Sequence, residues 1–210
     1  MPVGAFNINN RRYLGNKFKL FDFIEGVVAG FCQNVNVVGD LFAGTGAVAY
    51  GFARNKTVIT NDILYSNFIC NYAWLSPDAY RKKFISQIIT DYNSVVVRSS
   101  NYMSRNFADT YFSKKDCRKI GFIREDIERK FKAGEINFKE KAILVMTLIY
   151  AMDRIAKTCG HYDAYRQNVE FDENLELKIP CLPRNVHGEN KCFNEDINKL
   201  VRQINCDLLY

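Results

Sequence analysis

Several features that mark other classes of protein are scarce or missing in this chain of 210 residues. No apolar run approaches the length of a membrane-spanning helix, and no apolar signal segment stands at the N-terminus. The seven cysteines are scattered, odd in number and never spaced as C-x-x-C, which indicates reduced, packed thiols in a cytoplasmic protein. Only two histidines are present, so we expect no zinc or other metal site.

The composition is that of a globular protein, because 48% of the residues are hydrophobic and 14% are aromatic. This length suits one substantial core, or one domain that carries an insertion. The net charge of +6 is unevenly placed: residues 81–166 contain 18 Lys and Arg against 10 Asp and Glu, and the remainder contains 11 against 13. A basic insert in an otherwise neutral fold indicates a polyanionic partner. The alternative is that these charged helices are simply solvated.

The stretch 35–46, VNVVGDLFAGTG, organises the rest of the chain. A β-branched apolar run ends in Asp40, two glycines follow, and residues 47–54 continue as a helix, which predicts a buried parallel strand and a ligand-binding loop. Gly44-Thr45-Gly46 with the following residues also fits the loose dinucleotide pattern G-x-G-x-x-A, so an NAD site is one alternative. Asp40 disfavours that alternative, because it would repel a pyrophosphate and would suit a cationic ligand.

A second short strand is predicted at residues 57–62, and it also ends in an acid, Asp62. A carboxylate at the end of this strand can accept both hydroxyls of a ribose, with Ile63 against an adenine face. The alternative is that Asp62 caps the helix that follows.

The middle of the chain is predicted to be mainly helical. We expect helices over residues 64–74, from Pro77 to about Val97, from Ser113 to near Gly134, and over residues 139–156. Residues 154–167 then alternate tyrosine, histidine, glutamine and basic groups, which suits phosphates and base edges or, alternatively, a plain surface hairpin. An edge strand is expected at 175–180, a helix from Asn194 to about 204 and a last strand at 206–210.

Two motifs together resemble a known family. Asp40-x-Phe42-x-Gly44-x-Gly46 resembles the first motif of S-adenosylmethionine-dependent methyltransferases, in which this loop holds the methionine moiety. The N-terminal run Tyr13-Leu-Gly-Asn-Lys17-x-x-Leu resembles motif X of the Dam-like N6-adenine DNA methyltransferases, although Asn16 stands where the family usually has Ser or Gly.

The resemblance implies an α/β fold: a Rossmann-like S-adenosylmethionine-dependent domain with an inserted, mainly helical target-recognition subdomain. The expected divisions are 1–74 for cofactor binding, 75–185 for the helical insert with a hairpin, and 186–210 for the return to the methyltransferase domain. The expected partner is double-stranded DNA, and the expected setting is a restriction–modification system.

The resemblance also implies the roles of individual residues. The expected S-adenosylmethionine contacts are Tyr13, Lys17, Asp40, Phe42, Gly44, Thr45, Gly46, Asp62, Ile63, Asp196 and Ile197. Asp196 would accept from the exocyclic amine of the adenine, and Ile197 would cover its face, while an N-cap role for Asn194 or Glu195 is the alternative for this segment. The expected DNA contacts are Arg12, Arg154, Lys157, His161, Tyr162, Arg166 and Gln167.

The family's catalytic loop, Asp/Asn-Pro-Pro-aromatic, has no counterpart here. It follows the strand that residues 207–210 would form, and none of the four prolines, Pro2, Pro77, Pro180 and Pro183, is adjacent to another. We therefore expect an N-terminal portion of such an enzyme, which is inactive until a second polypeptide supplies the loop. The alternatives are a non-enzymatic DNA-binding module that keeps the fold, and the NAD-binding protein considered above.

Overall fold

The structure, a computed structural model, describes residues 5–11, 15, 17–158, 162, 170–171, 174–183 and 187–210. These residues form two compact units. The helical unit contains residues 5–6, 10–11 and the described residues of 80–181, and the sheet unit contains residues 7–9, those described in 15–79, and those described in 182–210. None of the described helices is long and apolar enough to cross a membrane.

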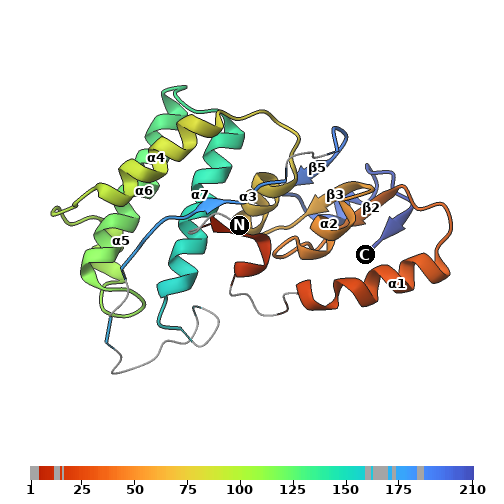
Figure 1. The fold of residues 1–210 in the computed structure, drawn as a ribbon, viewed down its shortest axis with the longest axis horizontal. Helices are drawn as coiled ribbons and strands as arrows, with labels where there is room; N and C mark the ends of the chain where they lie inside the picture. The colour runs from red at the N-terminus through yellow and green to blue at the C-terminus, as the bar shows by residue number, and fades with distance from the viewer. Residues whose placement is uncertain are drawn as a thin grey trace. The chain divides into compact units, whose positions relative to one another are not determined.

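The sheet unit is built on four parallel strands in the order β5-β3-β2-β6 (Figure 1). They are β2 (Val37–Asp40), β3 (Thr57–Asn61), β5 (Lys191–Phe193) and β6 (Leu208–Leu209). In the register of the sheet, Gly39 of β2 lies opposite Ile59 of β3 and Leu209 of β6. Counted along the chain, this is the order 3-2-1-4 that begins a doubly wound nucleotide-binding sheet. The expected α/β fold with a parallel sheet is confirmed.

The helices of this unit are η2 (Phe18–Leu20), α1 (Phe21–Phe31), α2 (Ala47–Phe52), α3 (Tyr65–Leu75) and α8 (Ile197–Leu200), and η1 (Ile8–Asn10) precedes them in the chain. Helix α2 packs on β2 and β3, and α3 packs on β3 and β5. Helix α1 packs on α2 at Gly51, where a Cβ atom would lie 2.1 Å from the ring of Phe21. Phe21 meets the buried Phe52 edge to face, with 5.1 Å between ring centroids.

The helical unit contains α4 (Lys82–Ser94), α5 (Tyr102–Asn106), α6 (Lys114–Lys132) and α7 (Phe138–Ile155). Helix α6 packs between α5 and α7, and α4 also contacts α7 (Figure 1). Fully buried aliphatic side chains fill these contacts, among them Ile120, Ile123, Ile127, Ile143, Leu144 and Met146. The helices predicted from Ser113 to near Gly134 and over residues 139–156 are thus present as α6 and α7, and their apolar faces form a core.

Side-chain caps fix where the two long helices begin. Ser113 Oγ accepts a hydrogen bond from the Asp116 amide, and Asn137 and Glu140 form a reciprocal capping box at the start of α7. The expectation that Pro77 starts a helix is wrong, because α4 begins only at Lys82. The amide of Arg81 instead donates to Glu140 Oε1 (2.9 Å), so these residues cross to α7 before turning into a helix.

The expected edge strand at 175–180 is present only in part. Ile179–Pro180 (β4) pairs in parallel with Ala5–Phe6 (β1) in a sheet of two strands. The residues before it are held by side chains: both ends of the Asn93 amide bond the backbone of Leu177 at 2.8 Å, and Asp116 Oδ1 accepts from the Leu175 amide at 2.9 Å. These bonds replace ladder bonds, so the segment is extended without being a strand.

Candidate functional site

The loop after β2 takes a backbone shape that requires glycine. Gly44 and Gly46 have φ angles of 55° and 76°, in the left-handed region. Gly46 is also the N-cap of α2, and a Cβ atom there would lie 2.0 Å from Asn71 Oδ1 of α3. The pattern G-x-G thus reflects both a dihedral requirement and a close approach of the loop to α3.

Amide groups of this loop donate hydrogen bonds within the protein. The Ala43 amide donates to the Asn61 carbonyl (3.0 Å), Gly46 to the Ala43 carbonyl (2.7 Å) and Gly44 to Asp62 Oδ2 (2.8 Å). A pyrophosphate at a dinucleotide loop is held by amides that are free to donate to it. These three amides are already engaged, which disfavours the dinucleotide interpretation.

Asp62, directly after β3, ties this loop to α3. Its Oδ2 accepts from the Gly44 amide and from Asn67 Nδ2 (3.0 Å), and its Oδ1 accepts from the Leu64 amide (2.8 Å). Oδ1 therefore keeps a lone pair for a further donor, although only 9% of the residue is exposed. Sequence reasoning located this acid but missed Gly44 and Asn67 as its partners, because nothing local in the sequence pairs them.

Asp40, the last residue of β2, is a second carboxylate at the same edge of the sheet. Only 2% of it is exposed, and its burial raises the pKa to about 7, although a hydrogen bond from the Ala49 amide and the charge of Lys17 act in the opposite direction. The charge of Asp62 adds to the rise. Asp40 thus changes its charge near neutral pH.

Apolar side chains stand beside this acid pair. Phe42 and Ile63 each follow the acid of their strand within two positions, and they are 76% and 68% exposed. Thr45, in contrast, is buried within the loop. Two carboxylates next to an aromatic and an aliphatic surface form a site that suits a cationic ligand with a flat apolar part.

The segment after β5 is attached to the same edge. Asn194 Nδ2 donates to the carbonyls of Asp62 (2.7 Å) and Ile63 (2.9 Å). Asp196 caps α8, because its Oδ1 accepts from the amide of Asn198 at 2.8 Å. The alternative N-cap at Asn194 or Glu195 is therefore wrong, and α8, at four residues, is shorter than expected. Ile197 is half-buried.

The residues of the expected N-terminal motif are covered only in part. Lys17 is exposed where η2 begins, and its charge acts on Asp40. Tyr13 and Arg12 lie outside the described residues. Three further expected DNA contacts besides Arg12, namely His161, Arg166 and Gln167, also lie outside the described residues.

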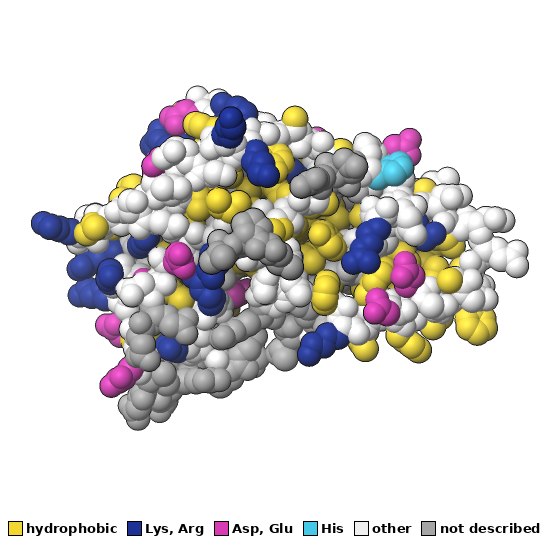
Figure 2. All heavy atoms as spheres, in the orientation of Figure 1, with side chains coloured by type: hydrophobic (Ala, Val, Ile, Leu, Met, Phe, Trp, Pro, Cys, Tyr) yellow, Lys and Arg dark blue, Asp and Glu magenta, His cyan; other side chains and the backbone are white. Residues whose placement is uncertain are grey.

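The remaining expected DNA contacts belong to the helical unit. Arg154 Nη2 donates to the Glu176 carbonyl at 2.7 Å, and Lys157 follows the end of α7. Tyr162 packs its ring on Tyr111, with 5.3 Å between centroids, and burial raises the pKa of its hydroxyl. Tyr162 is therefore held in an aromatic cluster. On the face shown in Figure 2, Lys and Arg side chains gather over the end of the helical unit that contains α5 and α6.

Known proteins match almost the whole chain. The family model described as D12 class N6 adenine-specific DNA methyltransferase matches residues 13–210. Modification methylase LlaI of Lactococcus lactis subsp. lactis is 30% identical over 95% of this chain and 35% of its own length. The type II methyltransferases M.FokI of Planomicrobium okeanokoites and M.NlaIII of Neisseria lactamica are each 28% identical, over 33% and 62% of their lengths. This chain thus spans about a third of the first two relatives, and no solved structure shows a significant match to it.

The matched residues include the glycine loop, both strand-end acids and helices α4 to α7. The family is the one whose motifs the sequence resembles. The chain belongs to the D12 class of N6 adenine-specific DNA methyltransferases.

Proposed function

We propose that this chain binds S-adenosylmethionine at the glycine loop and duplex DNA through the helical unit, within an adenine-N6 methyltransferase of a restriction–modification system. The observation that carries the proposal is the acid pair Asp40 and Asp62 at the carboxyl edge of neighbouring parallel strands, with Asp62 bonded to the Gly44 amide of the loop and its charge acting on Asp40. The printed names of the relatives, modification methylase and type II methyltransferase, support the reaction and its setting.

The residues at the loop fit this cofactor. S-adenosylmethionine carries a sulfonium and an ammonium, so two carboxylates favour it electrostatically, whereas they oppose the pyrophosphate of NAD. Asn71 Oδ1 is buried beside Gly46 without a hydrogen-bond donor among the described residues. This oxygen can therefore accept a hydrogen bond from a ligand at the loop. The cofactor would supply the methyl group.

Each residue of the site has a separate binding task in this proposal. Asp62 Oδ1 accepts from the ribose, and Asp40, where it is ionised, faces the cationic end together with the loop residues Gly44, Thr45 and Gly46. The other proposed contacts are Tyr13 and Lys17 at the methionine end, Phe42, Ile63 and Ile197 on apolar faces, and Asp196 at the adenine amine. The DNA contacts proposed are Arg12, Arg154, Lys157, His161, Tyr162, Arg166 and Gln167.

A further strand fits beside β6. In the part of the chain that the structure describes, β6 pairs only with β2, and Leu209 is 53% exposed. An unpaired parallel edge is a template for another strand. We propose that the catalytic loop reaches this edge on a further segment or on a second polypeptide.

Calorimetry tests the cofactor assignment. S-adenosylmethionine should bind the purified chain with a measurable heat, and NAD should not. Binding of NAD alone would contradict the proposal, and binding of neither would support the alternative of a DNA-binding module without cofactor.

A further inference from the structure

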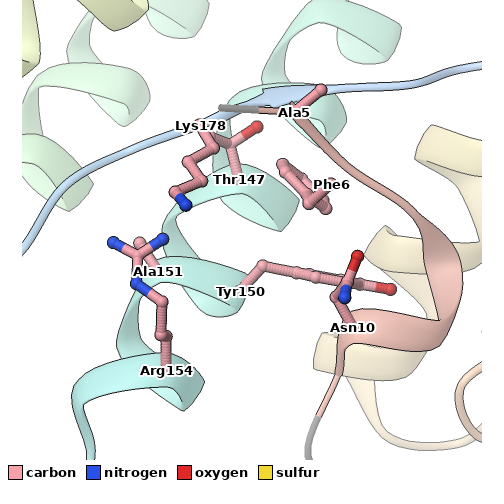
Figure 3. Close-up of a pocket in the computed structure, with 8 residues that line it drawn as sticks. All are labelled: Ala5, Phe6, Asn10, Thr147, Tyr150, Ala151, Arg154 and Lys178. Carbon is pink, nitrogen blue, oxygen red and sulfur yellow. The ribbon is translucent and has the colours of Figure 1, made fainter. Parts of the chain in front are cut away.

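A hollow of about 270 Å³ lies in the helical unit, lined by residues of β1 and α7 (Figure 3), but its aromatic wall is closed. The rings of Phe6 and Tyr150 are buried against each other, with 4.6 Å between centroids, so they offer no surface to a ligand. Exposed apolar surface lies instead on the sheet unit, where Figure 2 shows hydrophobic side chains along the edge formed by α1.

Helix α1 carries two apolar faces. One is centred on Phe21, which packs on Gly51 of α2. The other, the open face, consists of Phe23, Val27 and Phe31, which are 73%, 41% and 86% exposed. At about 100° per residue, these three side chains share an arc of about 80°, whose middle lies about 120° around the helix axis from Phe21. A helix that lies in a layer on a sheet has this pattern, because one face meets the neighbouring helix and another meets the strands.

The order of the helices indicates which strands would lie under the open face. Tyr50 of α2 meets Trp74 of α3 edge to face, with 5.8 Å between ring centroids, while Gly51 of α2 contacts Phe21 of α1. Helix α3 packs on β5 and β3, and α2 packs on β3 and β2. Since α3 occupies the β5 side of α2, α1 occupies the β6 side.

Helix α1 therefore extends over the edge strand β6 and past it. Neighbouring helices lie about 8–10 Å apart and neighbouring strands about 4.8 Å apart, so one helix spans about two strands. In the part of the chain that the structure describes, β6 pairs only with β2, and its Leu209 is exposed. The unpaired edge and the open face thus border one region, which strands added to β6 would fill.

We propose that the open face of α1 is a docking surface for a second polypeptide, which adds parallel strands to β6 and brings the catalytic loop. The inference rests on the proposed function, and it goes beyond an added strand because it assigns a helix face to the interface. Parallel strands under a helix are rich in Val, Ile and Leu, so the partner would set such side chains against Phe23, Val27 and Phe31.

Co-expression with a relative's remaining sequence tests this surface. The match covers only 62% of M.NlaIII, and the unmatched part of that protein is the probe. The chain should retain the probe through purification, and Phe23→Ser with Phe31→Ser should lower the yield of the probe at least about tenfold. Val96→Ser with Tyr102→Ser, at exposed positions of the helical unit, is the matched control and should leave the yield unaltered. Both double variants should keep the thermal melt of the wild-type chain, because the replaced side chains are exposed.

Three results would overturn the docking surface. They are no co-purification, a yield that the change of Phe23 and Phe31 leaves unaltered, and a dimer of the chain alone, seen by light scattering, that this change dissociates. In the last case a second copy would cover the open face.

Calorimetry with S-adenosylmethionine on the same chain separates this inference from the proposed function. If the cofactor binds and docking fails, the proposed function stands and the docking surface is wrong. If the cofactor does not bind, the proposed function fails, and co-purification alone decides the docking surface.

Discussion

At the scale of single residues, the two oxygens of the Asp62 carboxylate face different groups. Oδ2 holds the loop and α3 through Gly44 and Asn67, and Oδ1 has a lone pair left for a ligand. An apolar run that ends in an acid was enough to locate Asp62 from the sequence. Its partners could not be predicted, because Gly44 and Asn67 reach it only after the loop and α3 have folded around β3.

Asp62→Ala should weaken binding of S-adenosylmethionine by about 1–3 kcal/mol, the range for losing a charged hydrogen-bonding partner. Calorimetry measures the change, and Asp22→Ala on exposed α1 is the control that should leave binding unaltered. Asn67→Ala removes one donor to Oδ2 and leaves Oδ1 in place, so it should cost less than Asp62→Ala. An equal loss in both variants would mean that Asp62 only holds the loop.

Asp40 should make cofactor binding depend on pH. Because burial raises its pKa to about 7, the carboxyl is largely neutral at pH 6 and largely ionised at pH 8. A cationic ligand favours the ionised form, so affinity for S-adenosylmethionine should rise across this range. Asp40→Asn should bind more weakly at pH 8 and should lose this pH dependence, as measured by calorimetry at pH 6, 7 and 8.

In the absence of ligand, the free energy of unfolding of the wild type should fall as pH rises, whereas the affinity for the cofactor rises. A pKa raised in the folded state contributes stability that is fully present below the ordinary value of 3.8 and is lost as pH rises through about 7. Asp40→Asn should lack this loss in denaturant titrations. If the free energies of unfolding of the wild type and Asp40→Asn change with pH in the same way between pH 4 and 8, the Asp40 carboxyl is not buried in solution.

At the scale of elements, features set by neighbouring residues could be predicted, whereas pairings between residues far apart in the sequence could not. Ser113 caps α6 through a bond from the residue three positions on, so the start of α6 could be predicted from a short pattern. Asn137 caps α7 in the same way but was not recognised, and that helix was predicted to begin at 139, one residue late. Helix α5 was missed because it has five residues and little periodicity. The pairing of β1 with β4 was missed because two-residue strands show no alternation.

The contact between Arg81, directly before α4, and Glu140 of α7 leads to a prediction on stability. Glu140 is buried, and its carboxylate accepts two side-chain bonds from Arg81, at 2.8 and 2.7 Å, together with the Arg81 amide. These bonds lower the pKa of Glu140 to about 2. Glu140→Gln should therefore reduce the free energy of unfolding at pH 7 by about 1.5–3 kcal/mol, the value of hydrogen bonds to a charged group.

The contribution of Glu140 to the free energy of unfolding should depend on pH in the acid range. A lowered pKa contributes stability above the ordinary value of 4.5, and this stability is lost as pH falls through about 2. The difference between Glu140→Gln and the wild type should shrink over that range in denaturant titrations. Glu125→Gln, an exposed carboxylate on α6, should change stability by less than about 0.5 kcal/mol. A constant difference at all pH values would assign the effect to packing.

At the scale of the whole molecule, the surplus of basic residues between 81 and 166 predicts DNA binding that weakens steeply with salt. Replacing Arg154, Lys157 and Arg166 together by Gln should reduce the slope of log affinity against log salt by about 2–3, because each phosphate contact contributes about 0.9. Fluorescence anisotropy with a labelled duplex measures the slope. A matched triple change of Lys191, Lys199 and Arg202 should leave it unaltered, and equal slopes in the two triples would show that the charge of the insert is only solvated.

The pairing of β1 with β4 also has a consequence for how the protein is made. Ala5 pairs with Ile179, so all of helices α4 to α7 lie between the two partners in the sequence and must be synthesised before they can meet. Likewise β2 and β3 can pair early, but β5 and β6 must wait for residues 191–209. Such high contact order slows folding. Neither sheet can therefore be completed from a local stretch of the sequence, and both units depend on segments that join them late in the order of the chain.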